Sequence, residues 1–479
     1  RGRWIGVMWI GVLLAAALCL ALGVFINETT GEFPQKEQEL FEGIVAVIAV
    51  VILTWMVFWM RKVSRNVKVQ LEQAVDNALQ KGNHHGWALI MMVFFAVARE
   101  GLESVFFLLA AFQQDVGIWP PLGALLGLAV GDAMGYTVDS LSIQEIRQSY
   151  GPNGLLGYDL VNGYADVTSY TQLAAFTCNG LLLGLTRGQM TGKMLPLHRY
   201  VGLSSREWAA SQRPWGRPST TFCWLLQQPE LCRRHCMDTR MLDTLSRQTL
   251  GTPETPANNY DSPGGITTAI GVGLFFHEDR TDQHEIDLLG AEAVALTQGS
   301  PSAFLSGAVL AHIMSRLLRQ PHLPLKRLVM EAVEAMKEQF GHQYSQAFEV
   351  ATLVRHAIAY SESPNLRPVD VMERLGCDSA AQVLAGAIYT CLTNSADFDS
   401  AMIAAVNHSG RSAAVGAVTG AILGARLGEE ALPDFYIECL EPAEVLRELA
   451  DDLYTGCPME KGNKLFDLDW DYKYLHGGQ

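Results

Sequence analysis

Two carboxylates and one arginine interrupt an otherwise apolar run of the sequence, residues 87–112. Arg99, Glu100 and Glu103 form the ionisable part of the pentad Arg-Glu-Gly-Leu-Glu. Side chains three or four residues apart on a helix are neighbours, so all three can share one stripe. Ionisable groups at such a depth in a bilayer are costly and mark a functional site by default. The pair of carboxylates predicts a site for a hard cation, and the alternative is an internally paired structural cluster.

Three stretches of the sequence are long and apolar enough to cross a bilayer. They cover residues 4–26, 43–60 and 87–112. The connection 27–42 is acidic, whereas 61–85 carries five Lys and Arg against two Asp and Glu. The positive-inside rule therefore predicts that 61–85 is cytoplasmic. We expect residues 1–118 to be a multi-pass membrane segment, with the lipid bilayer as its partner.

This N-terminal part resembles the bacterial oxidase-dependent (ferrous) iron permease family over about residues 1–128. The resemblance implies that the segment lies in a bacterial inner (cytoplasmic) membrane. It also implies that the pentad binds iron, with Glu100 and Glu103 as metal ligands and Arg99 as their ion-pair partner. Members of that family have seven spans and two such motifs. We expect the counterpart of the first helix, its motif and the last three spans to be missing here, which makes the segment a truncated permease.

The composition changes from residue 119 onward. Residues 119–479 hold 26 Lys and Arg against 40 Asp and Glu, which is −14 of the net charge of −15. Such acidity argues against a nucleic-acid partner. Apolar side chains recur with helical periodicity and strand-like alternation is nearly absent, which predicts an all-α soluble domain over 119–445 and a C-terminal tail over 446–479. Core helices are expected over 291–297, 303–318, 324–340, 345–360, 380–392 and 400–406.

Three motifs of this second part stand in a recognisable order. They are 123–135 (GALLGLAVGDAMG), 168–172 (TSYTQ) and 407–425 (NHSGRSAAVGAVTGAILGA). Together they resemble the ADP-ribosylglycohydrolase family over about residues 122–440. The resemblance implies an all-α fold with a central cleft, where two magnesium ions hold an ADP-ribosyl group and orient a water against its anomeric bond. Cations of this kind require carboxylate ligands.

Most metal-ligand positions implied by this resemblance are substituted. The glutamate of the family falls on Asp139, which we assign as the candidate catalytic carboxylate. The degraded positions are Ser169, Tyr170, Arg411, Ala413 and Val415, where the family has four aspartates and a threonine. Neutral and cationic side chains cannot compensate two divalent cations. We therefore expect no cofactor in this domain, the ancestral pair of magnesium ions having been lost.

Arg411 brings a fixed positive charge to a position where the family holds metal. We expect it to pair with Asp139 or Asp132, or to contact the phosphates of ADP-ribose, the alternative being a solvated loop residue. The candidate ligand-binding residues are Asp132, Thr168, Asn407, His408, Ser409, Gly410 and Arg411. A second hypothesis retains catalysis, with Asp132, Asp139 and Asp166 holding one metal ion.

The preferred interpretation is a membrane-anchored pseudoenzyme that binds ADP-ribose, an ADP-ribosylated protein or an ADP-ribosylating toxin. The alternatives are an active metal-dependent ADP-ribosyl hydrolase, iron transport by the permease-like segment, and a gene fusion without a function. The side of the membrane stays open. Three crossings from a cytoplasmic start place the domain outside, whereas the family acts on cytoplasmic targets.

Overall fold

The computed structural model describes residues 119–160, 163–214, 221–277, 281–363, 365–459 and 466–478. All of them belong to one unit of the chain, Val116–Gln479, which is separate from the unit Arg1–Asp115. The three predicted spans and the pentad with Arg99, Glu100 and Glu103 lie outside the described residues. Within them, only the helix Pro301–Arg319 is long and apolar enough to cross a membrane, and 83% of its apolar window is buried inside the domain.

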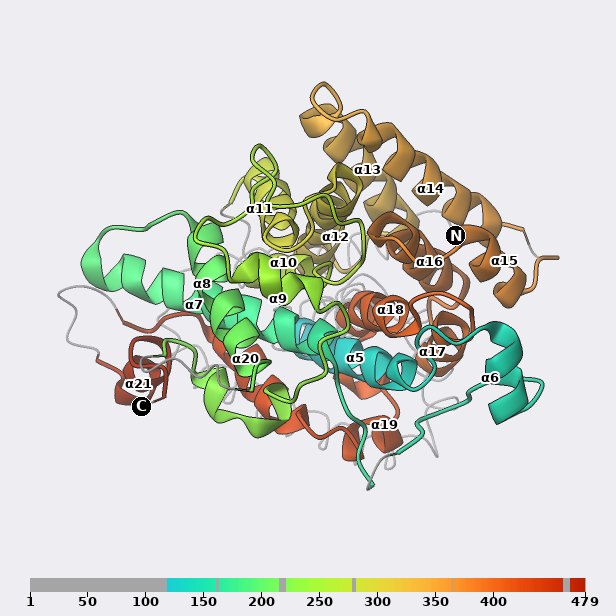
Figure 1. Cartoon of the computed structure of the whole chain (residues 1–479), viewed down its shortest axis with the longest axis horizontal. Coiled ribbons are helices and arrows are strands. Elements are labelled where there is room, and N and C mark those ends of the chain that lie inside the picture. The colour runs from blue at the N-terminus through green and yellow to red at the C-terminus, as the bar shows by residue number, and fades with distance from the viewer. Residues whose placement is uncertain are drawn as a thin grey trace, which may run out of the picture. The chain divides into compact units, whose positions relative to one another are not determined.

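Helices make up the described part of the chain, and its one β-type pairing is an isolated parallel bridge between Ala165 and Leu440. The predicted all-α class is confirmed, and Figure 1 shows the arrangement. The α-helices are α5 (Trp119–Tyr136), α6 (Ile143–Tyr150), α7 (Ser169–Thr191), α8 (Leu197–Ser211), α9 (Arg240–Leu245), α10 (Thr268–Phe275), α11 (Gln283–Ala295), α12 (Pro301–Arg319), α13 (Leu325–Phe340), α14 (Gln346–Ser361), α15 (Pro368–Leu375), α16 (Ala380–Thr393), α17 (Phe398–Val406), α18 (Ser412–Leu427), α19 (Asp434–Glu438), α20 (Ala443–Thr455) and α21 (Leu468–Tyr474). Short 3₁₀ turns follow at η1 (Trp224–Gln227), η2 (Pro229–Leu231) and η3 (Glu429–Ala431).

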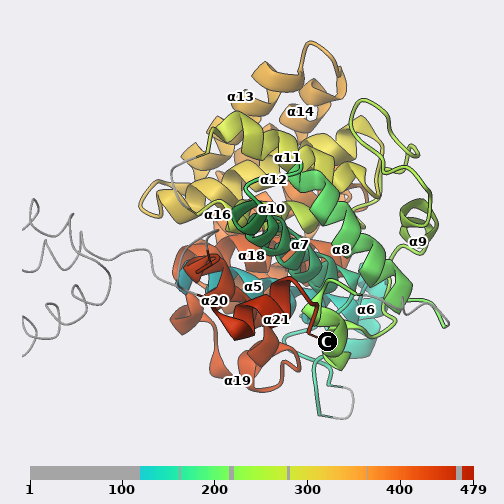
Figure 2. The same cartoon turned by 90° about the vertical axis from the view of Figure 1, so that its left-hand side faces the viewer.

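Helices α5 and α18 form the centre of the domain and pack backbone against backbone (Figures 1 and 2). Glycines recur every fourth residue on both helices, which removes side chains from one stripe of each. A Cβ on Gly131 would lie 1.9 Å from the carbonyl oxygen of Gly416, and one on Gly127 would lie 2.2 Å from that of Gly420. Because any larger residue would collide, two of the three motifs seen in the sequence serve this contact.

The antiparallel course of α5 and α18 brings the end of α5 beside the start of α18. Helix α7 begins at the same place, where Thr168 and Thr171 donate hydrogen bonds to Asp132 of α5. The three motifs, far apart in the sequence, therefore meet at one end of the central helix pair.

The C-terminal residues pack into the domain, and the predicted boundary at 446 falls inside α20. Helix α21 buries Trp470 and Tyr474. The indole nitrogen of Trp470 donates to Thr186 on α7 at 2.9 Å, and the hydroxyl of Tyr474 donates to Asp452 on α20 at 2.6 Å. The segment beyond residue 466 is thus part of the helical core, where the sequence predicted a tail.

Candidate functional site

Asp132 ties the end of α5 to the start of α7. Its carboxylate is fully buried and accepts hydrogen bonds from the backbone and hydroxyl groups of both Thr168 (2.8 and 2.7 Å) and Thr171 (3.0 and 2.6 Å). Burial raises the pKa of Asp132 to about 6, against the opposing effect of these four donors. Because both oxygens are engaged within the protein, Asp132 and Thr168 position α7 and leave no free ligand atom.

Asp139 lies in the turn after α5 and contacts the start of α18. Its Oδ1 accepts a hydrogen bond from the backbone nitrogen of Ala413 at 3.1 Å, and its Oδ2 accepts one from Ser140 at 3.1 Å. The side chain is 5% exposed. Burial raises the pKa of Asp139 above its ordinary value. This carboxylate is held at the first turn of α18, where the helix dipole favours a negative charge.

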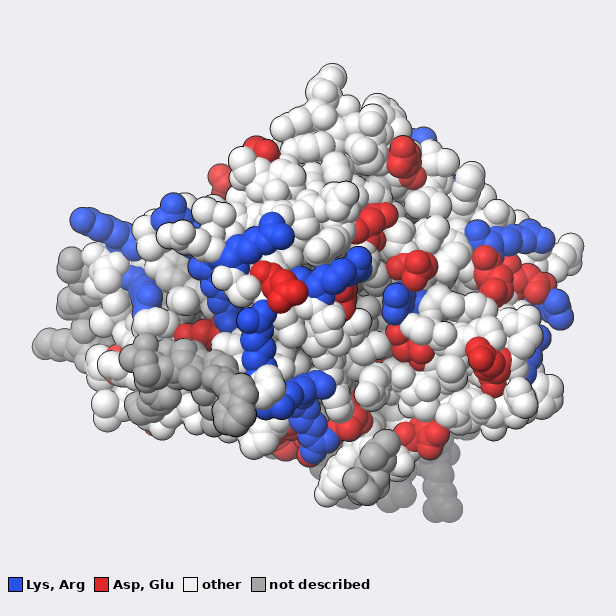
Figure 3. All heavy atoms as spheres, in the orientation of Figure 1, with Lys and Arg blue, Asp and Glu red and all other residues white. Residues whose placement is uncertain are grey.

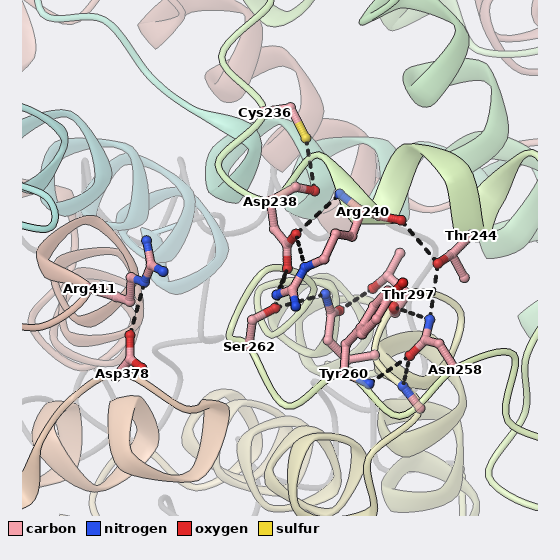
Figure 4. Close-up of polar contacts among 12 residues, drawn as sticks. Cys236, Asp238, Arg240, Thr244, Asn258, Tyr260, Ser262, Thr297, Asp378 and Arg411 are labelled. Carbon is pink, nitrogen blue, oxygen red and sulfur yellow. Dashed lines mark hydrogen bonds and ion pairs between the residues drawn. The ribbon is translucent and has the colours of Figure 1, made fainter.

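Arg411 connects two acidic side chains at the same place. Its Nη1 lies 3.7 Å from Oδ2 of Asp139 and donates to Ser140 at 2.9 Å, while its Nε donates to Asp378 at 3.1 Å (Figure 4). Of the two carboxylates expected as partners of Arg411, Asp139 is in contact with it. Asp132 instead accepts hydrogen bonds from the start of α7. Asp378 had no signal in the sequence, because it reaches Arg411 only through the turn that follows α15.

The degraded positions now serve the packing of the domain. The Ser169 hydroxyl accepts a hydrogen bond from the backbone nitrogen of Met237 at 3.0 Å. Tyr170, Ala413 and Val415 are buried, and burial raises the pKa of Tyr170 well above its ordinary value. None of these side chains supplies a carboxylate.

The structure does not bring together the three aspartates of the alternative metal site. Within the part of the chain that the structure describes, no three His, Cys, Asp or Glu side chains are placed to hold a metal ion. Asp132 is tied to α7, and Asp166 forms an ion pair with Arg233. The residues that the structure describes therefore do not fit the magnesium pair of the family.

The loop 407–410 braces this end of the domain. Asn407 exchanges two 2.8 Å hydrogen bonds with the backbone of Leu155, and the hydroxyl of Ser409 accepts one from Ile143 at 3.0 Å. A Cβ on Gly410 would lie 2.5 Å from the carbonyl oxygen of Cys377. His408 is buried, and its Nδ1 accepts a hydrogen bond from Gly410 at 3.0 Å. These four predicted residues lie beside Arg411, and their polar groups form hydrogen bonds within the protein.

A second polar cluster was missed in the sequence. Arg240 makes two 2.8 Å contacts with the carboxylate of Asp238 and lies 4.5 Å from the ring centre of Tyr260 (Figure 4). Ser262 donates to the same carboxylate and lies 3.4 Å from the amide nitrogen of Gln298. Nothing in the sequence indicated this cluster, because a network among side chains from several segments leaves no local pattern.

Tyr170 is buried at the start of α7, and burial and the charge of Asp139 raise the pKa of its hydroxyl. The candidate site therefore comprises Arg411 with its carboxylate partners Asp139 and Asp378, and the Asp238 and Arg240 pair supplies a second guanidinium. Guanidinium groups beside hydroxyl and amide donors are suited to phosphate and ribose oxygens.

Comparison with known proteins finds two families. The family of ADP-ribosylglycohydrolases matches residues 122–463, so this chain belongs to the ADP-ribosylglycohydrolase family. A second match, to the iron permease FTR1 family, covers residues 1–150. Both resemblances found in the sequence are thus confirmed, and the two matches share α5 and α6.

Individual relatives divide in the same way. The ferrous iron permease EfeU of Escherichia coli O157:H7 is 91% identical over 136 residues, which are 28% of this chain and 49% of that protein. EfeU of Shigella flexneri is 90% identical over 114 residues, or 24% of this chain and 48% of that protein. This chain spans about half the length of these relatives. A solved ADP-ribosylglycohydrolase-related protein complex is 21% identical with a TM-score of 0.41, covering 71% of this chain and 98% of that one.

Proposed function

We propose that this protein is a membrane-attached member of the ADP-ribosylglycohydrolase family that acts by binding an ADP-ribosyl group without metal-dependent hydrolysis. Its ligand would be ADP-ribose, an ADP-ribosylated protein or an ADP-ribosylating toxin. The observation that carries the proposal is the ion pair between Arg411 and Asp139, at the positions where the family arranges carboxylates around metal.

The charges at this position favour an anion over a cation. Arg411 keeps 37% of its side chain exposed although it contacts Asp139 and Asp378. A partly exposed guanidinium can donate N–H hydrogen bonds to the oxygens of a diphosphate. It would then supply the positive charge that a metal ion supplies in the family. Catalysis by the family mechanism would need several carboxylates around each cation, and the buried Tyr170, Ala413 and Val415 supply none.

Calorimetry with ADP-ribose on the full chain in detergent tests this proposal. We expect heat of binding from the wild type and an affinity at least about tenfold lower for Arg411→Ala, because a charge-assisted contact to phosphate contributes about 1.5 kcal/mol or more. Arg367→Ala removes an exposed arginine of another ion pair and should leave the affinity unchanged. An absence of heat, or magnesium-dependent release of ADP-ribose from a modified protein, would contradict the proposal.

A second function is favoured by the identity of the N-terminal part to ferrous iron permeases. We propose that residues 1–118 lie in the bacterial inner membrane as a multi-pass segment and that Glu100 and Glu103 bind iron there, with Arg99 as their ion-pair partner. In this proposal an assembly of several chains carries out the permeation.

Iron flux into proteoliposomes that contain the full chain tests this second function. We expect flux above that of empty vesicles, and a loss of most of it in the double variant Glu100→Ala and Glu103→Ala, since carboxylates are the hard ligands of the pentad. Glu72→Ala changes an acidic residue of the predicted cytoplasmic connection and serves as the control. Equal flux in all three proteins would rule out an iron site at the pentad.

A further inference from the structure

One segment of the domain has a charge opposite to that of the rest. Residues 187–247 hold ten Lys and Arg against four Asp and Glu, in a chain whose net charge is −15. No Asp or Glu occurs between Asp166 and Glu207. The segment comprises the end of α7, all of α8 and all of α9.

Two of these cations lie on one stripe of α8. Arg199 and Arg206 are seven residues apart, close to two helical turns, and Arg213 follows seven residues later, just beyond the end of the helix at Ser211. Arg206 donates to the carbonyl oxygens of Leu245 at 3.2 Å and of Arg247 at 2.6 Å. These contacts place the next cation, Arg247, beside the stripe.

Arg234 adds a fifth cation, because its Nη2 lies 3.5 Å from the carbonyl oxygen of Arg213. We name the basic belt as Arg199, Arg206, Arg213, Arg234 and Arg247. Figure 3 shows basic side chains running together across this face of the molecule, with few acidic ones between them.

Little of the positive charge of the basic belt is compensated. Arg206, Arg234 and Arg247 donate to backbone carbonyl oxygens, which orient a guanidinium without neutralising it. Arg213 has an acidic partner, Asp243, but that carboxylate is 86% exposed and the pair is weak in water.

Exposed apolar side chains lie at the end of the stripe. The connection between α7 and α8 presents Met194 and Leu195, which are 53% and 52% exposed, next to the exposed Lys193. Large apolar groups flanked by cations are typical of segments that rest in the interface of a bilayer. A nucleic acid would use the cations but would give these two side chains no apolar environment.

We propose that the basic belt and the connection 192–196 rest on an anionic phospholipid surface. The inference goes beyond ADP-ribose binding and rests on the proposed membrane attachment of residues 1–118, which holds the domain close to a bilayer. Anionic head groups attract the basic belt and repel the acidic remainder of the domain. Both forces act over about one Debye length, which is about 8 Å at physiological salt. The domain would therefore take one orientation on the membrane.

Hydrogen exchange of the full chain in lipid nanodiscs tests the inference. Discs of phosphatidylcholine alone are compared with discs that also contain phosphatidylglycerol. We expect backbone exchange over 192–213 to be slowed at least about threefold by the anionic lipid, and the protection to disappear in high salt.

Charge variants supply matched controls. Arg199→Glu with Arg213→Glu should abolish the protection, whereas Arg199→Lys with Arg213→Lys should keep most of it. Arg327→Glu with Arg355→Glu makes the same charge change at exposed sites of α13 and α14 and should leave the protection intact.

The outcomes separate the two proposals. A chain that does not enter nanodiscs would overturn the membrane attachment, and the orientation inferred from it would fall as well. A chain that enters them but exchanges equally over 192–213 in both lipids would overturn the basic belt alone. Protection by an oligonucleotide that exceeds protection by the anionic lipid would also overturn it, in favour of a nucleic-acid surface.

Discussion

His408 shows how a residue of a recognition motif can serve the fold. Its Nδ1 accepts a hydrogen bond from the backbone nitrogen of Gly410, and its Nε2 lies 2.9 Å from the carbonyl oxygen of Ala405. Only the neutral ring with its proton on Nε2 satisfies both contacts. Burial lowers the pKa of His408 to about 4.

This pKa predicts that acid destabilises the domain through His408. Because the folded pKa lies below the ordinary value of about 6.5, the contribution to stability is present above that pH and is lost as the pH falls toward 4. The loss between pH 7 and pH 4 amounts to about 3 kcal/mol of unfolding free energy. Urea unfolding of the full chain in detergent at several pH values measures it.

The comparison of two variants isolates this effect. His408→Asn should be less stable at neutral pH but should lose less stability on acidification than the wild type. His356→Asn, which changes an exposed histidine of α14, should keep the pH dependence of the wild type. If His408→Asn kept the full slope between pH 4 and pH 6.5, another group would be responsible.

Single residues also mark the limit of what the sequence could predict at the site. The pairing of Arg411 with Asp139 followed from residues that the family motifs align. Asp378, Asp238 and Ser262 were not predicted, because each reaches the site from a turn or loop and its partners are distant in the chain. Side-chain networks of this kind leave neither a period nor a spacing to read.

At the scale of elements, the two central helices depend on their glycines. A side chain larger than glycine in this stripe would collide with the backbone of the facing helix. The helical backbone cannot move locally to make room, so the whole of α5 and α18 would have to move apart.

Gly127→Ala is therefore expected to destabilise the domain by at least about 3 kcal/mol, since its Cβ would lie 2.2 Å from a carbonyl oxygen. Thermal unfolding followed by circular dichroism measures the change. Gly157→Ala, at a position with open space around it, should be within about 0.5 kcal/mol of the wild type. A Gly127→Ala protein as stable as this control would show that the helix pair can separate without cost.

Helical periodicity in the sequence predicted α12, α13, α14, α16 and α17 to within a few residues. It found only the last turn of α11, and α7 was not predicted because apolar, small and polar residues are buried on all its sides. A helix enclosed by neighbours has no solvent face, so the alternation on which such predictions depend is absent. Helix α13, which has one buried and one exposed face, was predictable for the opposite reason.

At the scale of the whole molecule, the negative net charge gave no indication of the basic belt that we infer to contact anionic phospholipid. The sum of −14 over 119–479 predicted no nucleic-acid partner, yet 187–247 alone carries six more cationic than anionic side chains. The sum could not show this, because the fold collects Arg199, Arg206 and Arg213 with Arg234 and Arg247 on one face. Charge must be counted by surface and not by domain.

The end of the chain should also contribute to global stability. Trp470→Ala would remove a buried indole that bonds Thr186, and is expected to lower the unfolding free energy by about 3 kcal/mol or more. Leu468→Ala, in the same helix but with a side chain 74% exposed, should change it by less than about 0.5 kcal/mol. Chemical unfolding of both variants checks this, and equal stability would mean that α21 is not part of the folded unit.

The contact between α5 and α18 joins two helices that are synthesised far apart in time. Gly131 and its partner Gly416 are 285 residues apart, so α5 leaves the ribosome long before the helix that covers it exists. At about 5 to 20 residues per second, the apolar α5 waits for roughly 15 to 60 s without its main partner. During that interval its apolar surface is open to chaperones, to other nascent chains and to the lipid beside a translocon. The order of translation thus leaves a central helix of this domain without its main partner until most of the chain has been made.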